Sequence, residues 1–119
     1  MTATPLAGRK ILVVEDDDMI AQVIVDLLED AGATIIGPVG TLEQAMVAAT
    51  DTSLACDSAI LDINLHGIAS YSVADALTAR HVRVVFATGY GKQGIDAAYQ
   101  HYPHCTKPFT WQALLSALG

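Results

Sequence analysis

The sequence predicts an α/β protein in which helices cover both faces of a parallel β-sheet. Apolar residues make up 52% of the chain and charged residues only 16%, a balance that suits a sheet buried on both sides. Short apolar runs rich in β-branched residues alternate along the chain with segments of helical periodicity. This alternation is typical of strand–helix–strand units with parallel strands. At 119 residues the chain is long enough for one domain with one core.

The predicted elements alternate from the beginning of the chain to its end. The predicted strands occupy residues 10–14, 34–38, 58–62, 83–87 and 102–106, and the predicted helices occupy residues 19–31, 42–49, 72–79, 91–100 and 111–118. An irregular stretch at residues 63–71 follows the third strand. No repeat or low-complexity tract interrupts the series.

Local signals support each boundary in the first half of the chain. Asp17 or Asp18 can cap the first helix, and Gly32 stands where a left-handed residue commonly ends one. The second strand ends in Pro38, which cannot donate a hydrogen bond to a neighbouring strand and so favours an edge position. Residues 41–44 fit a capping box that begins the second helix.

The boundaries of the second half depend on similar signals. Residues 72–75 form another capping-box candidate at the start of the third helix. The fourth predicted helix is weak, because Gly91 and Gly94 both lower helix propensity. Thr110 can cap the last helix.

Charge and cysteine content narrow the classes of function. The net charge is −7 and no cluster of Lys or Arg is present, so we expect no direct binding of nucleic acid. No run has the length of a signal peptide or a membrane span, so we expect no membrane contact. Cys56 and Cys105 form no C-x-x-C pattern, which favours a reducing cytoplasm.

Chemically active side chains follow four of the five predicted strands. Glu15 and Asp16 follow the first strand, and Asp62 ends the third. Thr88 follows the fourth strand and Lys107 the fifth. Because parallel strands end at the same edge of a sheet, we expect these side chains to converge there.

Each of these residue types has a chemical use and an ordinary alternative. Clustered carboxylates repel one another, and a hard divalent cation such as Mg²⁺ offsets that repulsion. Asp62 can act as a nucleophile, or it can be a turn residue at a strand end. Lys107 can pair with Asp62 or hold a phosphoryl oxygen, and the alternative is a solvated lysine. Thr88 can donate to a phosphoryl oxygen or cap a helix. Pro108 makes the Lys107–Pro108 bond a candidate cis peptide.

The chain resembles the receiver domain of bacterial two-component response regulators. The matching blocks are Ile-Leu-Val-Val-Glu-Asp-Asp at 11–17, Ile-Leu-Asp-Ile-Asn at 60–64, Ala-Thr-Gly at 87–89 and Lys-Pro-Phe at 107–109. The Phe-Ala-Thr-Gly-Tyr motif at 86–90 resembles a subgroup that is often stand-alone. The resemblance implies a flavodoxin-like (βα)5 doubly wound sheet with strand order 2-1-3-4-5. It also implies one receiver domain over residues 1–119, with its core at 10–118 and no effector domain.

The resemblance also implies roles for individual residues. Asp62 matches the phosphoacceptor, and Thr88 and Lys107 match the residues that contact the phosphoryl oxygens. The implied cofactor is Mg²⁺, with Mn²⁺ as a substitute. Its implied ligands are Glu15, Asp16, Asp62 and the backbone carbonyl of Asn64.

Two departures from the family pattern concern the output of the domain. The position three residues before Lys107 is usually aromatic but here is His104, so His104 and Tyr90 are both candidate switch residues. The loop at residues 64–70 lacks the usual Pro-Gly pair. We interpret all four histidines as surface or packing residues, since their spacing fits no metal-ligand pattern.

The function implied by the resemblance is a single-domain response regulator. It would take a phosphoryl group from a sensor histidine kinase or a histidine phosphotransfer protein, and signal to a protein partner through residues 91–100 and the strand that follows. It would be a monomer or weak dimer, and no enzyme beyond self-catalysed phosphotransfer and autodephosphorylation. Two alternatives remain: an interaction module that works without phosphorylation, and a phosphatase-like hydrolase that uses Asp16 and Asp18.

Overall fold

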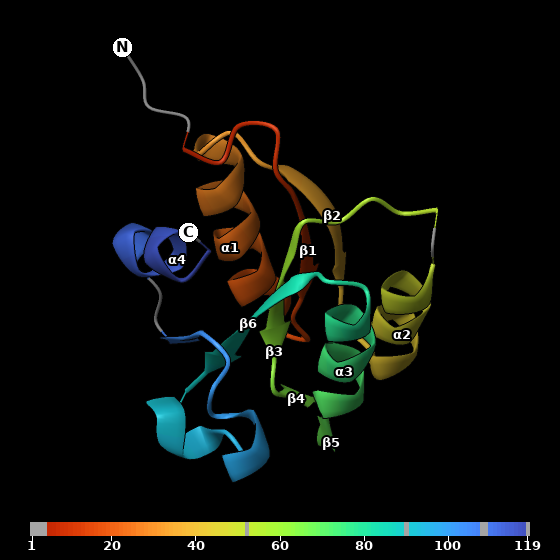
Figure 1. The fold of residues 1–119 in the computed structure, drawn as a ribbon. Coiled ribbons are helices and arrows are strands. Elements are labelled where there is room, and N and C mark those ends of the chain that lie inside the picture. Colours follow the sequence, from red (N-terminus) through yellow and green to blue (C-terminus); the bar gives the residue numbers. More distant parts are fainter. Residues whose placement is uncertain (1–4, 52, 90, 108–109, 119) are drawn as a thin grey trace.

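A single five-stranded parallel sheet forms the centre of the molecule (Figure 1). The computed structural model describes residues 5–51, 53–89, 91–107 and 110–118. The sheet has the order β2-β1-β3-β6-β7, from strands β1 (Lys10–Val14), β2 (Thr34–Val39), β3 (Ser58–Asp62), β6 (Arg83–Thr88) and β7 (His104–Thr106). Counted along the chain, these strands lie in the order 2-1-3-4-5, so the predicted flavodoxin-like topology is confirmed.

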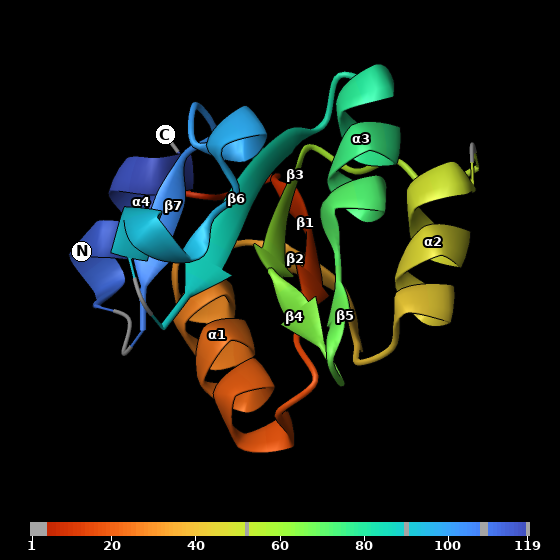
Figure 2. The ribbon, with the colours of Figure 1, turned by 90° about the horizontal axis from the view of Figure 1, so that it is seen from below.

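Helices cover both faces of this sheet (Figures 1 and 2). They are α1 (Asp18–Asp30), α2 (Leu42–Thr50), α3 (Tyr71–Ala79) and α4 (Trp111–Leu118). Apolar residues of α1 and α4 pack on one face, and those of α2 and α3 pack on the other. Side chains alternate along a strand, so Ile11 and Val13 of β1 belong to the first core and Leu12 and Val14 to the second. All four are at most 1% exposed, which explains the uninterrupted apolar run in the sequence.

The first helix begins and ends as its sequence signals indicate. The Asp17 carboxylate accepts hydrogen bonds from the backbone N–H groups of Met19 and Ile20, so Asp17 rather than Asp18 is the cap. Gly32 follows the helix with a φ of 98°, in the left-handed region expected for it. The strand with Pro38 lies at the edge of the sheet, as predicted, and extends to Val39.

The stretch after β3 is more regular than the sequence suggests. Residues 64–69 form a small antiparallel hairpin of β4 (Asn64–Leu65) and β5 (Ile68–Ala69). Helix α3 then begins at Tyr71, with Ser70 at the N-cap position. The predicted capping box at 72–75 is therefore wrong, because Ser72 already lies inside the helix.

The predicted fourth helix is also wrong in type. Residues 91–100 contain two short 3-10 helices, η1 (Gly91–Gly94) and η2 (Ala97–Tyr99), rather than an α-helix. Gly91 has a φ of 63°, which a continuous α-helix does not allow. The last strand begins at His104 instead of residue 102, because Pro103 has no N–H to donate. The Thr110 hydroxyl accepts the N–H of Ala113, so the predicted cap of α4 is confirmed.

In the described part of the chain, no helix is both long and apolar enough to cross a membrane.

Candidate functional site

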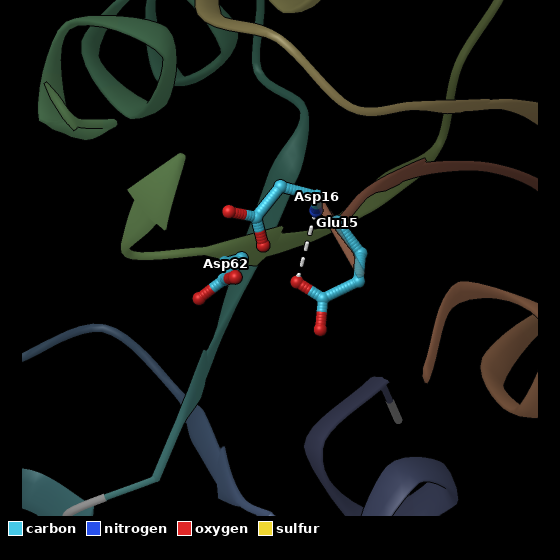
Figure 3. A group of neighbouring side chains, drawn as sticks. All are labelled: Glu15, Asp16 and Asp62. Atoms are coloured by element: carbon cyan, nitrogen blue, oxygen red, sulfur yellow. Dashed lines mark hydrogen bonds between the residues drawn. The ribbon is translucent and has the colours of Figure 1, made fainter. Parts of the chain in front are cut away.

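The predicted side chains do meet at the carboxyl edge of the sheet. Glu15 and Asp16 follow β1, Asp62 ends β3, and oxygens of these three carboxylates lie within 4.8 Å of one another (Figure 3). Thr88 ends β6, and Lys107 directly follows β7. The N–H of Lys107 donates to the carbonyl of Thr88 at 2.8 Å, which fixes the two strand ends side by side.

The Lys107 ammonium lies between two of the carboxylates. Its Nζ is 2.8 Å from Glu15 Oε1 and 3.4 Å from Asp62 Oδ2. Burial would lower the pKa of Lys107, but the two carboxylates outweigh it and hold that pKa above its ordinary value. Lys107 is therefore charged, and it neutralises only part of the negative charge that the three acids can carry.

Glu15 is the most buried of the three acids. It is 3% exposed, and its Oε2 accepts the N–H of Asp16 at 3.1 Å. Burial, together with the neighbouring Asp62, raises the pKa of Glu15 to about 8, and Lys107 offsets only part of this rise. In the absence of a cation, this site favours a proton on Glu15.

Asp16 has different surroundings. Burial alone would raise the pKa of Asp16. Two hydrogen bonds outweigh burial and lower that pKa below its ordinary value: one from the backbone N–H of His66, at 2.9 Å, and one with the Asp62 side chain. Asp16 is therefore ionised at neutral pH and holds a fixed orientation. Asp18, by contrast, is exposed in the first turn of α1, which removes it from the arrangement that a phosphatase-like hydrolase would need.

A cleft of about 330 Å³ opens beside Asp62. Its lining includes Asn64, Thr88 and Lys107, so a small anionic group that enters it meets an ammonium and a hydroxyl-bearing residue. The three carboxylates form an all-oxygen donor set, which suits a hard divalent cation. The residues present therefore fit Mg²⁺.

Of the two candidate switch residues, His104 lies within the described part of the chain. His104 lies in β7, paired in register with Phe86. Tyr90 and the Lys107–Pro108 bond fall outside the described residues, so the second switch candidate and the candidate cis peptide stay predictions.

Two contacts of the site were not predicted from the sequence: His66 donates its N–H to Asp16, and the Ser70 hydroxyl donates to the Asp62 carbonyl. Neither contact has a sequence signal, because both depend on the hairpin.

Comparison with known protein families identifies the chain. Residues 11–119 match the response regulator receiver domain. The chain belongs to this family. No match was found among curated proteins.

Solved structures of other receivers have the same fold. The solution structure of SdrG from Sphingomonas melonis Fr1 has 40% sequence identity and a TM-score of 0.81, and the alignment covers 92% of each chain. The BeF3-activated conformation of SdrG from Pseudomonas melonis Fr1 has 38% identity and a TM-score of 0.77, over 99% of this chain and 96% of that one. The receiver domain of the sensor histidine kinase PA1611 from Pseudomonas aeruginosa PAO1, with a magnesium ion in its active-site cleft, has 25% identity and a TM-score of 0.78, over 94% and 95% of the two chains.

Proposed function

We propose that this receiver accepts a phosphoryl group on Asp62 with the help of Mg²⁺ and signals through a change of its protein-binding surface. The donor would be the phosphohistidine of a sensor histidine kinase or a histidine phosphotransfer protein. One observation carries the proposal: Asp62 lies on the cleft with two further carboxylates on one side and Lys107 Nζ at 3.4 Å.

The proposed reaction is an in-line displacement at phosphorus. An oxygen of Asp62 attacks, a P–O bond forms, and the P–N bond to the donor imidazole breaks, with the electron pair leaving on nitrogen. Lys107 is placed to stabilise the charge that develops on the phosphoryl oxygens. Mg²⁺ held by Glu15, Asp16, Asp62 and the Asn64 carbonyl would supply further positive charge for those oxygens.

The acyl phosphate would change the balance of charge at the cleft. A phosphoryl group adds roughly −1.5 to −2 of charge and strong acceptor oxygens. Thr88 at the end of β6 and Lys107 directly after β7 both line the cleft, so both can gain contacts with the phosphoryl group. If these contacts form better in one conformation of the receiver than in another, they shift the existing equilibrium between the two conformations toward the first.

The segment between β6 and β7 is placed to report that shift. Its Gly94 lines the cleft, while its far end is attached to α3. The Tyr99 hydroxyl donates to both oxygens of Asp75, at 3.0 and 3.1 Å, and the hydroxyl of Tyr102 lies 2.9 Å from that of Thr78. We therefore propose the surface of α3 and residues 91–102 as the responsive surface.

The relatives support the chemistry. SdrG has been observed in a BeF3-activated conformation, and the PA1611 receiver with magnesium in its cleft. The acidic cluster of this chain provides oxygen ligands for the same ion. We keep the expectations of a cytoplasmic protein and of a monomer or weak dimer; Cys56 and Cys105 are free thiols, as a reducing compartment would favour.

The direct test uses phosphoramidate, a small P–N donor, with Mg²⁺. We expect the wild type to gain one phosphoryl group, seen by intact mass and lost on treatment with hydroxylamine. Asp62→Asn should gain none, and Asp30→Asn, which changes an exposed acid in the last turn of α1, should behave as the wild type. Equal labelling of the wild type and Asp62→Asn would refute the assignment.

A further inference from the structure

The hairpin that follows Asp62 contacts two of the three clustered acids, through the N–H of His66 to Asp16 and the N–H of Asn64 to Asp62. Its strands pair Asn64 with Ala69 and Leu65 with Ile68. The turn between them consists of His66 and Gly67, with φ values of 52° and 86°. Two successive left-handed residues are typical of a type I′ turn, which matches the twist of a two-residue hairpin.

The turn reaches Asp16 through a backbone group. The N–H of His66 donates to Asp16 Oδ2 at 2.9 Å, across 50 positions of the sequence. The His66 imidazole is 64% exposed on its side-chain surface and lies farther away, with Nδ1 3.8 Å from the same oxygen. The close contact is therefore made by the peptide, and its direction is set by the conformation of the turn.

The base of the hairpin is fixed to Asp62. The fully buried hydroxyl of Ser70 donates to the Asp62 carbonyl, and the Ser70 N–H donates to the carbonyl of Ile63. Leu65 is 1% exposed and anchors the first strand in the core. The N–H of Gly67 closes the turn on the Asn64 side-chain oxygen at 2.7 Å. Because the hairpin is fixed at its base, its tip cannot move freely relative to Asp16.

We infer that the His66–Gly67 turn is a positioning element for the metal site, which holds the Asp16 carboxylate beside Glu15 and Asp62. Ionised carboxylates within 4.8 Å repel one another, and Asp16 is the most exposed of the three acids. A hydrogen bond from a fixed peptide N–H to a carboxylate is charge-assisted and opposes rotation of Asp16 away from the cluster. Loss of a group that hydrogen-bonds a metal ligand commonly weakens metal affinity by about 10- to 100-fold. The inference rests on the proposed function, since it assigns a role toward Mg²⁺.

The chain offers a variant that acts on the backbone alone. A Cβ added at Gly67 would meet no atom within 4 Å, so Gly67→Val strains the turn only through its left-handed φ. Gly8 provides a matched control, because it has a φ of +80° and is equally open but lies far along the chain from the hairpin. Asn tolerates left-handed φ, so Gly67→Asn should rescue the turn.

The test measures Mg²⁺ affinity by titration of amide chemical shifts in the four proteins. We expect Gly67→Val to weaken Mg²⁺ binding by about tenfold relative to the wild type. Gly8→Val should lose comparable stability in urea without loss of Mg²⁺ affinity, and Gly67→Asn should recover most of the affinity. Gly67→Ala imposes the same kind of strain with a smaller group and replaces the valine variant if the latter does not fold.

The outcomes separate this inference from the proposed function. If the wild type binds Mg²⁺ and Gly67→Val binds it equally well, the turn does not position Asp16 and the inference is overturned. The same conclusion follows if Gly8→Val weakens binding as much as Gly67→Val does. If the wild type binds no Mg²⁺, the metal-dependent part of the proposed function fails, and the inference fails with it.

Discussion

The buried carboxyl of Glu15 predicts an unusual dependence of stability on pH in the metal-free protein. Its pKa is raised from an ordinary value of 4.5 to about 8, chiefly by burial. Between these two values the folded chain keeps a proton that the unfolded chain has lost. The free energy of unfolding should therefore fall as pH rises, because proton release then favours the unfolded state.

The size of this effect follows from the two pKa values. Linkage between pH 6 and pH 8 gives a loss of about 2 kcal/mol for one such group. The other groups of the site with shifted pKa values make contributions to the free energy of unfolding that do not change between pH 6 and pH 8. Asp16 has a lowered pKa, so its contribution is complete well below pH 6, and Lys107 has a raised pKa, so its contribution is lost only above pH 10.5. Glu15→Gln, which cannot titrate, should remove the dependence.

The assay is urea unfolding of the wild type and Glu15→Gln at pH 6 and pH 8, in EDTA. The difference between the two proteins isolates Glu15 from every other titrating group. We expect the wild type to lose about 2 kcal/mol more than the variant between the two pH values. Mg²⁺ at pH 8 should restore stability to the wild type. Equal pH dependence in both proteins, or a wild type that becomes more stable toward pH 8, would refute the reasoning.

Three further predictions concern the scaffold of the site. Asp17→Ala removes the cap of α1 and should lower the free energy of unfolding by about 1 kcal/mol in urea titrations, whereas Asp18→Ala, inside the first turn, should cost clearly less. Arg80 donates to the carbonyls of Ala49 and Leu54 at 2.6 and 2.9 Å, so Arg80→Met should cost about 1.5–3 kcal/mol and speed amide exchange in α2; unchanged exchange there would contradict this role. Ile60 is fully buried in β3, so Ile60→Ala should cost about 2–5 kcal/mol by calorimetry, and a loss under 1 kcal/mol would show that the core closes around the gap.

The sheet and most of the site could be predicted because both depend on strands that are buried on two sides. Such strands appear in the sequence as short continuous apolar runs, and β1 and β3 have the bounds predicted from those runs, 10–14 and 58–62. The parallel topology then brings the residue after each run to one edge. Asp62 and Lys107 could be paired on this basis alone, without any sequence motif.

The remaining features depend on contacts that no local pattern records. Residues 91–100 have enough apolar residues for a helix, but Gly91 adopts a left-handed φ, and tyrosine contacts with α3 hold the segment in another form. The hairpin at 64–69 has strands of only two residues each, too short for an alternating pattern to be recognised. Ser70 fits a helix cap by residue type, yet its hydroxyl is used by the Asp62 carbonyl. In each case tertiary contacts override local preference.

The hydrogen bond between Glu15 and Lys107 has a consequence for the order in which the site is assembled. Its two members are 92 positions apart, so the pair joins the first strand of the chain to the last. During synthesis from the N-terminus, the acids emerge long before their counter-charge. A nascent or truncated chain without β7 would hold its carboxylates together with no ammonium between them. If the proposed function holds, the competence to take up a phosphoryl group would thus require β7, and a chain released before β7 could not compete with longer copies for the same donor.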